Sequence, residues 1–358
     1  MHTCEKTPEY FAWLDLCRFL AAFLVLISHV RTHAFVGYNE LEGAHNLFGT
    51  GFMTLMGFGN TGVVIFFVLS GFLVGGKLFV NAQKQSFKPS SYILDRTLRI
   101  WIPLIPAVLF GTLVSLFLGH AFSATNFIGN MLGLQGIFVS SVPLNPSLWT
   151  IAYEIWFYVF ALGVGLCLSA KRFTFAGVTI ITLSLAMLSA LDIRYFLCWL
   201  IGAFAYIRRP TVASSRCLIF AIFLCAVGAL QIKLGEAGML ASFAIFRVEN
   251  FRLMLAIGFA LLVRQLILMP PRHYFLKKVE KMGAWLATFS YSLYLTHNPL
   301  LFLFEYFGLE QMRALNPASL FLYLMVILGA LTFAYLVYFV SERNTGTAKA
   351  FCRAKLVV

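Results

Sequence analysis

The stretch from Tyr10 to Thr32, YFAWLDLCRFLAAFLVLISHVRT, combines a long apolar run with the polar residues Asp15, Arg18 and His29. An α-helix needs about 20 apolar residues to cross a bilayer, so this stretch predicts a transmembrane helix. A charge inside such a helix costs about 2.5–3.5 kcal/mol on insertion scales, and it usually faces a bundle interior or a watery cavity. The sequence therefore predicts a membrane protein whose first span carries part of a polar site.

Arg18 and His29 are expected to share one face of this first helix. At about 100° per residue, their separation in the sequence corresponds to three turns plus about 20°, and the helical rise places them about 16 Å apart along the axis. One face thus holds a cation near one membrane surface and a titratable imidazole near the other. This arrangement favours an enzyme whose anionic substrate lies on one side and whose chemistry takes place deeper in the bundle.

Composition extends the membrane interpretation to the whole chain. Of its 358 residues, 60% are hydrophobic and 11% are charged, whereas an average soluble domain is about 25% charged. The net charge of +13 would suit a nucleic-acid-binding protein, but that class is excluded because the positive charges sort by loop. The first apolar stretch is too long and too charged for a signal peptide, so it is expected to remain as the first span. The seven cysteines include no Cys-x-x-Cys pair and are expected to be reduced packing residues.

Ten hydrophobic spans are expected, in a single membrane domain covering residues 1–358 with a short cytoplasmic tail at 342–358. The spans lie roughly at 10–32, 57–79, 99–119, 147–169, 173–190, 194–208, 215–232, 251–269, 285–305 and 319–341. If the N-terminus is inside, the inner segments hold all but six of the 27 lysines and arginines, as the positive-inside rule requires. The expected fold class is therefore an all-α polytopic helix bundle with both termini in the cytoplasm.

Two arginines at the start of the third span are candidates for anion binding. Arg96 and Arg99 lie in SYILDRTLRIWIPLIP, and because they are three apart they are neighbours on one helix face. Ordinary positive-inside anchoring explains them without a ligand. Alternatively, they form a phosphate clamp, since planar guanidinium groups bind phosphate bidentately. Arg18 is expected at the same depth, so three arginines can converge on one anionic ligand.

Small residues in the second span also have two interpretations. In FFVLSGFLVGG, Ser70 and Gly71 form a small-residue face with Gly75 and Gly76, which is typical of close helix packing. The same lack of side chains can open a groove for a thin acyl chain, so Ser70 and Gly71 are candidate ligand-binding residues. Ser70 as a covalent nucleophile is a further option.

Glu154, in PSLWTIAYEIWFYV, is expected about two turns from the outer surface, at the depth of His29. A buried carboxylate needs a partner, and His29 is a natural one. The neighbouring Trp149, Tyr153, Trp156 and Tyr158 are either interfacial belt residues or platforms for a sugar ring. We therefore predict that Glu154 and His29 form a pair.

Two further histidines, His33 and His297, lie in or beside the predicted spans. His29 and His33 have the i, i+4 spacing of metal ligands, but the sequence shows no third or fourth ligand, so no metal is expected. His297 lies in FSYSLYLTHNPLL, two residues before Pro299. It is either a second functional polar group or a residue that satisfies carbonyls freed by the proline, and the second interpretation is favoured.

The order of these motifs resembles the acyltransferase-3 family, which consists of integral membrane O-acyltransferases, mostly bacterial, with about ten spans. The motifs are Asp15-x-x-Arg18 followed by His29, FFVLSGF at 66–72, Arg96-x-x-Arg99, SLWTIAYEIWFY at 147–158 and FSYSLYLTHNP at 289–299. The resemblance covers Tyr10 to about Glu342. One departure is Leu16–Cys17, where the family pattern often has a glycine before the arginine.

The resemblance implies transfer of an acyl group, commonly acetyl, from cytoplasmic acyl-coenzyme A to a carbohydrate hydroxyl at the outer face of a bacterial inner membrane. Its arginine–histidine pair maps onto Arg18 and His29, its Arg-x-x-Arg onto Arg96 and Arg99, and its span-four glutamate onto Glu154. It implies no permanently bound cofactor. The expected partners are acyl-coenzyme A, a lipopolysaccharide, exopolysaccharide or other glycan or glycolipid acceptor, and the lipid bilayer, with no nucleic acid.

The resemblance also suggests a mechanism. The three arginines hold coenzyme A, and its pantetheine arm threads along Ser70 and Gly71. His29 acts as general base because an imidazole exchanges protons near neutral pH, and Glu154 orients the imidazole. An acyl-enzyme on His29 or Ser70 is the alternative mechanism. The alternative function is a transporter or flippase of a lipid-linked sugar, which often shows inverted repeats that are not evident here.

Overall fold

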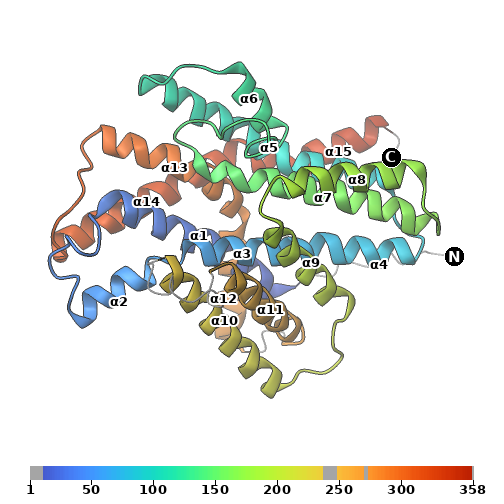
Figure 1. Ribbon diagram of the computed structural model, residues 1–358, viewed down its shortest axis with the longest axis horizontal. Helices are drawn as coiled ribbons and strands as arrows, with labels where there is room; N and C mark the ends of the chain where they lie inside the picture. Colours follow the sequence, from blue (N-terminus) through green and yellow to red (C-terminus); the bar gives the residue numbers. More distant parts are fainter. Residues whose placement is uncertain (1–10, 237–247, 270–272, 357–358) are drawn as a thin grey trace.

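The computed structural model describes residues 11–236, 248–269 and 273–356, and its regular structure within these ranges is helical (Figure 1). The longer helices are α1 Ala12–Ala34, α5 Pro89–Phe117, α7 Trp149–Ser169, α8 Phe175–Ser189, α9 Ile193–Ile207, α10 Ser215–Glu236, α11 Val248–Leu266, α12 Tyr274–Thr288, α13 Ser290–Tyr306 and α14 Pro317–Val340. The shorter ones are α2 Leu47–Leu55, α3 Gly59–Ser70, α4 Lys77–Gln83, α6 Ala124–Met131 and α15 Thr345–Leu356, with the π-helical turn η1 Gly71–Gly76 and the 3-10 turns η2 Pro146–Leu148 and η4 Glu342–Asn344.

Six helical segments in the described ranges are long and apolar enough to cross a membrane: Trp13–Ala34, Leu47–Gln83, Pro89–Phe117, Pro146–Ser169, Ser215–Lys233 and Pro317–Lys355. α8 and α9 are shorter apolar helices. Each of the ten expected spans overlaps a helix, but the ninth, at 285–305, is divided because α12 ends at Thr288 and α13 begins at Ser290. α13 has 17 residues and buries several polar side chains. Buried polar side chains in an apolar helix are typical of a helix that lines a polar site.

Local sequence signals explain many of the helix ends. Thr174 accepts a hydrogen bond from the backbone N–H of Gly177 at the start of α8. Asn316 and Ser319 form a capping box at the start of α14, where Pro317 occupies the first turn. Such caps satisfy backbone N–H groups that have no partner inside the helix. The helix boundaries are therefore set by the residues that the chain places beside each apolar run.

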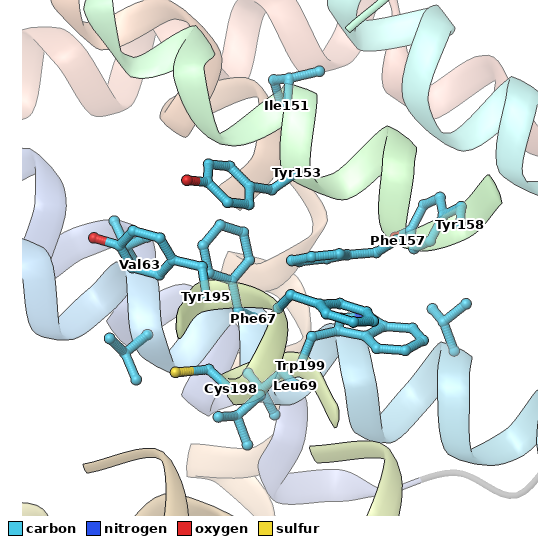
Figure 2. Close-up of a cluster of buried hydrophobic side chains, with 14 of the residues drawn as sticks. Val63, Phe67, Leu69, Ile151, Tyr153, Phe157, Tyr158, Tyr195, Cys198 and Trp199 are labelled. Carbon is cyan, nitrogen blue, oxygen red and sulfur yellow. The ribbon is translucent and has the colours of Figure 1, made fainter. Parts of the chain in front are cut away.

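Two apolar clusters hold the bundle together. One gathers side chains of α3, α5, α7, α9 and α11, and the other gathers side chains of α1, α13 and α14. Phe67 lies in the first cluster, where its ring contacts those of Tyr153, Phe157 and Tyr195 at centroid distances of 5.2–5.5 Å (Figure 2). The ring of Trp149 lies 6.4 Å from it. Aromatic packing thus fixes α3 against α7 and α9.

The glycines of the second span allow a close helix contact. A Cβ on Gly71 would lie 1.9 Å from the carbonyl oxygen of Trp199, and a Cβ on Gly202 would lie 2.1 Å from that of Val68. The backbones of η1 and α9 therefore approach too closely for any side chain between them. This contact corrects the prediction that Gly71 lines a ligand groove, because the glycine face is filled by α9.

The described chain begins and ends on the same side of the bundle. At this side, Lys349 of α15 lies 2.7 Å from Asp95 of α5, and both residues line one cavity with Asp15 of α1. At the opposite end, Gln311 donates a hydrogen bond to the carbonyl oxygen of Thr32 at 3.2 Å. The loops that follow α1 and α13 thus lie together, far along both helices from the cavity.

Candidate functional site

A cavity of about 610 Å³ lies among the ends of α1, α5 and α15 and the walls formed by α3, α7 and α13. Its wall combines apolar side chains with the following polar ones: Asp15, Arg18, Ser70, Lys77, Asp95, Arg96, Arg99, Thr150, Glu154, Tyr158, Tyr206, Thr288, Ser290, Tyr291, Tyr294, Thr345 and Lys349. Five of these residues are cationic and three are carboxylates, so the cavity has an excess of positive charge. That balance favours an anionic ligand.

The three arginines predicted to converge do line this cavity together. Arg18 forms an ion pair with Asp15, with 2.9 Å between Nη1 and Oδ1. Arg99 pairs with the buried carboxylate of Glu342, whose second oxygen accepts a hydrogen bond from Ser292 at 3.0 Å. Two of the three cations therefore already have a partly neutralising partner.

Arg96 differs from the other two arginines. Its guanidinium carbon lies 5.3 Å from the ring centroid of Tyr158 and 6.0 Å from that of Tyr92. In the part of the chain that the structure describes, Arg96 has no carboxylate partner, and its buried Nε has no hydrogen-bond acceptor. Of the three arginines, Arg96 thus has the charge least neutralised by a neighbouring carboxylate.

Glu154 also lines the cavity, but the predicted pair with His29 is wrong. The hydroxyl of Tyr158 donates to one carboxylate oxygen at 2.6 Å, and the hydroxyl of Tyr291 donates to the other at 3.2 Å. The prediction assumed that α7 starts at the outer surface. Instead, the residues before α7 are already buried, and the amide of Asn145 donates to the carbonyl of Leu295 inside the bundle.

This buried start places Glu154 deeper than the sequence indicated. Ser147 lies within 3.4 Å of His297 in the middle of α13, and Glu154 follows it by seven positions, or about 10 Å of helical rise. The carboxylate therefore reaches Tyr291, nearer the start of α13, and shares the cavity with the arginines.

His29 meets another histidine. Its Nδ1 lies 2.8 Å from Nε2 of His297, and the two rings have a centroid distance of 5.0 Å. The second nitrogen of His297, Nδ1, lies 3.1 Å from the carbonyl oxygen of Leu293. The favoured interpretation of His297 was that it satisfies carbonyls freed by Pro299. The carbonyl that loses its helical partner to Pro299 is that of Leu295, and Asn145 satisfies it, so this interpretation is corrected.

The histidine pair lies just beyond the cavity. Phe66 and Tyr294 line the cavity, and their rings contact each other at a centroid distance of 5.6 Å. The ring of His297 follows at 6.0 Å from that of Tyr294. One layer of aromatic side chains thus separates the charged cavity from the two imidazoles.

Ser70 and His33 have partners that bear on the predicted chemistry. Ser70 lines the cavity, and its hydroxyl accepts a hydrogen bond from the indole of Trp199 at 3.3 Å. An indole N–H cannot take up a proton, so this contact does not activate the serine. His33 pairs with Glu305 at 2.7 Å, so the two histidines spaced for a metal turn to different partners. Over the described ranges, no group of three or more potential metal ligands gathers.

Several features of the site were missed by the sequence analysis: Lys77, Tyr291, Glu342, Lys349, the hydrogen bond from Tyr158 to Glu154 and the role of His297 as partner of His29. The sequence signal that could have identified part of the site is a group of polar residues within one apolar stretch. The segment Ser290–Asn298 holds five buried polar side chains in one apolar helix, which is expensive in a membrane unless they are satisfied by one another.

A family model described as an acyltransferase domain, acyltransferase-3, matches residues 11–339. Among curated proteins and solved structures, none matches the chain. The matched range contains His29, His297 and all of the cavity residues except Thr345 and Lys349.

Proposed function

This chain belongs to the acyltransferase-3 family, and from that premise we propose that it is a membrane O-acyltransferase. It moves an acyl group, acetyl in the first instance, from cytoplasmic acyl-coenzyme A to a hydroxyl of an envelope or exported carbohydrate. The observation that best supports this proposal is the cavity lined by Arg18, Arg96 and Arg99. Coenzyme A is an anion with several phosphate charges, and arginine is the side chain best suited to bind phosphate.

The shape of the cavity supports this donor. Its cationic and acidic residues Asp95, Arg96 and Lys349 lie near the start of α5, whereas Phe66 and Tyr294 lie toward the histidine pair. The phosphates bind at the charged end, and the thin pantetheine arm extends past Ser70 toward the aromatic layer. Glu154, held by two tyrosines on the wall, balances the arginine charge and keeps both hydroxyls in place.

The proposed reaction is a direct transfer at His29. Nε2 of His29 removes the proton from the acceptor hydroxyl, and the resulting oxygen attacks the carbonyl carbon of the thioester. The carbon–sulfur bond breaks, and the coenzyme A thiolate takes the proton from His29. Phe66 and Tyr294 must turn aside for the thioester to reach the imidazole, so the aromatic layer acts as a gate. An acyl-enzyme route would instead give parallel double-reciprocal plots in initial-rate experiments.

The proposal includes an orientation in a bacterial inner membrane. The end of the bundle that holds the cavity mouth faces the cytoplasm, where acyl-coenzyme A is made. The loops after α1 and α13 face outward, where the acceptor glycan lies. The positive-inside distribution of lysine and arginine supports this direction.

The test is release of thiol from acetyl-coenzyme A by the purified protein in nanodiscs, with and without a crude envelope glycan fraction. Wild-type protein should release thiol only when the glycan is present. His29→Ala should reduce turnover by at least ~100-fold, the lower range of general-base catalysis, and His33→Ala, one turn away on α1, should stay near wild type. Folded wild-type protein that releases no thiol, even from longer acyl donors, would point to a flippase of a lipid-linked sugar.

A further inference from the structure

We propose that His297 is a positioning residue: it holds His29 in the tautomer that carries its proton on Nδ1 and leaves Nε2 as the basic nitrogen. The catalytic part of this inference rests on the proposed acyl transfer at His29. The tautomer itself follows from the contacts between the two rings, and it can be measured separately.

The argument starts at a backbone carbonyl. Nδ1 of His297 lies 3.1 Å from the carbonyl oxygen of Leu293. A carbonyl oxygen only accepts hydrogen bonds, so Nδ1 of His297 carries a proton. His297 is 1% exposed, and in the described part of the chain it contacts no carboxylate, so its neutral form is the one expected in this apolar setting. The remaining nitrogen, Nε2, then holds a lone pair and accepts.

The lone pair on Nε2 of His297 determines which nitrogen of His29 carries the proton. Nδ1 of His29 lies 2.8 Å from Nε2 of His297, a distance typical of a good hydrogen bond. Because Nε2 of His297 accepts, Nδ1 of His29 must donate. A neutral imidazole carries one proton, so the lone pair of His29 lies on Nε2. That nitrogen is the one assigned to proton abstraction in the proposed reaction.

The surroundings of Nε2 of His297 agree with its role as acceptor. The hydroxyl oxygen of Ser147 lies 3.4 Å away, and this oxygen already accepts a hydrogen bond from the side-chain amide of Asn298. The hydroxyl proton of Ser147 is therefore available to face Nε2. Both neighbours of Nε2, the Ser147 hydroxyl at 3.4 Å and Nδ1 of His29 at 2.8 Å, can therefore donate to it, and the shorter contact is the one to His29.

The inference explains how the site works without the predicted Glu154–His29 pair. When Nε2 of His29 takes the acceptor proton, its ring becomes positive, and the Nδ1–H bond to His297 strengthens. By accepting this bond, His297 stabilises the imidazolium, the role that a carboxylate has beside a catalytic histidine. It does so as a neutral group, and the bond geometry, rather than a buried anion, sets the orientation of the base.

The activity test compares His297→Phe with His297→Gln. Phenylalanine fills the space of the ring but offers no acceptor, so kcat should fall by about 100-fold, the low end of general-base catalysis, while the KM for acetyl-coenzyme A stays unchanged. The glutamine carbonyl can reach the position of Nε2 and accept from His29, so this variant should remain within about tenfold of wild type. The control is His33→Phe, which removes the other histidine of α1, the helix that carries His29, and should keep wild-type kcat.

The direct test is solid-state NMR of nanodisc-embedded protein labelled with ¹⁵N-histidine, with the His29 signals assigned through His29→Ala. Wild type should show a protonated Nδ1 and an unprotonated Nε2 for His29. His297→Phe should mix the two tautomers, and His297→Gln should restore the first. A His29 protonated on Nε2 in wild type, or equal activity of the two His297 variants, would overturn the proposal.

The two tests separate failure of this inference from failure of the proposed function. If no thiol is released by folded wild-type protein, the acyltransferase proposal fails, and the ¹⁵N spectrum still decides the tautomer. If thiol is released but His297→Phe keeps wild-type kcat, the acyltransferase proposal stands and the positioning role is overturned.

Discussion

Arg96 and Arg99 lie three residues apart at the start of α5, yet they meet different partners in the cavity. Arg99 forms an ion pair with Glu342, whereas Arg96 faces the rings of Tyr92 and Tyr158. A cation that already has a carboxylate partner gains less from a phosphate than one that lacks it. The two arginines of the motif are therefore expected to contribute unequally to binding of the proposed donor, although their sequence positions look equivalent.

We expect Arg96→Gln to raise the KM for acetyl-coenzyme A by about 10–100-fold, the equivalent of one hydrogen bond to a charged group. kcat should change little, because the guanidinium binds the donor before and during transfer. Steady-state thiol release over a range of donor concentrations measures both constants. Arg313→Gln, an exposed arginine outside the cavity, is the control, and a loss in kcat at unchanged KM would contradict the clamp.

The sequence predicted which residues gather at the site better than it predicted their pairing. Arg18, Arg96, Arg99 and Glu154 were all identified from residue type and motif, and all of them line the cavity. The partner of Glu154 was missed because it depends on where α7 starts within the bundle. That depth follows from tertiary contacts such as the hydrogen bond from Asn145 to Leu295, and no local pattern reports it.

Among the elements, the contact between η1 and α9 is the one most sensitive to side-chain size. Both segments contribute glycines, and their backbones meet where each glycine lies. A π-helical turn widens the helix locally and is often found at functional sites. Here it begins directly after Ser70, which lines the cavity. The packing of these two helices therefore supports one wall of the cavity.

Gly71→Ala should destabilise the protein by about 1–3 kcal/mol, as expected for overpacking. Its new Cβ would meet the carbonyl of Trp199, and a backbone atom cannot rotate away as a side chain can. Thermal unfolding followed by tryptophan fluorescence in detergent measures the change. Gly51→Ala in α2, where a Cβ meets nothing within 4 Å, should be neutral or stabilising. Equal melting temperatures for Gly71→Ala and wild type would contradict the close contact.

Hydrophobic runs predicted where the long helices lie, because crossing a membrane requires long apolar stretches. Most ends differ by a few residues, but α5 begins ten residues before the predicted span and α12 eleven. The division of the ninth span was missed. Thr288 and Ser290 flank Phe289, and their hydroxyls donate to the carbonyls of Trp285 and Ala287, a local pattern that competes with the helix and was overlooked within the apolar run. Tertiary packing accompanies the break, because the ring of Phe289 contacts those of Phe19 and Tyr335.

At the scale of the whole molecule, the cavity and the paired loops lie at opposite ends of the helices. The cavity end collects Lys77, Lys349 and the three arginines, and the loop end collects few cations. This asymmetry of charge was visible in the sequence, and it is the basis of the proposed orientation. The identity of the helices that line the cavity was not visible, because it depends on the order in which spans pack.

Membrane orientation can be tested with single cysteines and a membrane-impermeant maleimide. Glu40→Cys, exposed in the loop after α1, should be labelled in intact cells, because this end faces outward. Lys84→Cys, exposed at the other end, should be labelled only after the membrane is permeabilised. Labelling is measured as the increase over that of the wild-type protein, because the native cysteines can also react. The reverse pattern would invert the proposed orientation and remove the cytoplasmic donor from reach of the cavity.

The cavity joins residues from both ends of the described chain, since Asp15 of α1 and Lys349 of α15 line it together, and Glu342 holds Arg99. During biosynthesis, the ribosome releases these segments at opposite times. A nascent chain that has inserted only its early helices therefore lacks part of the cavity wall. If the cavity binds the proposed donor, the binding site is complete only after translation has passed the residues of α15. The proposed activity then depends on insertion of the whole bundle.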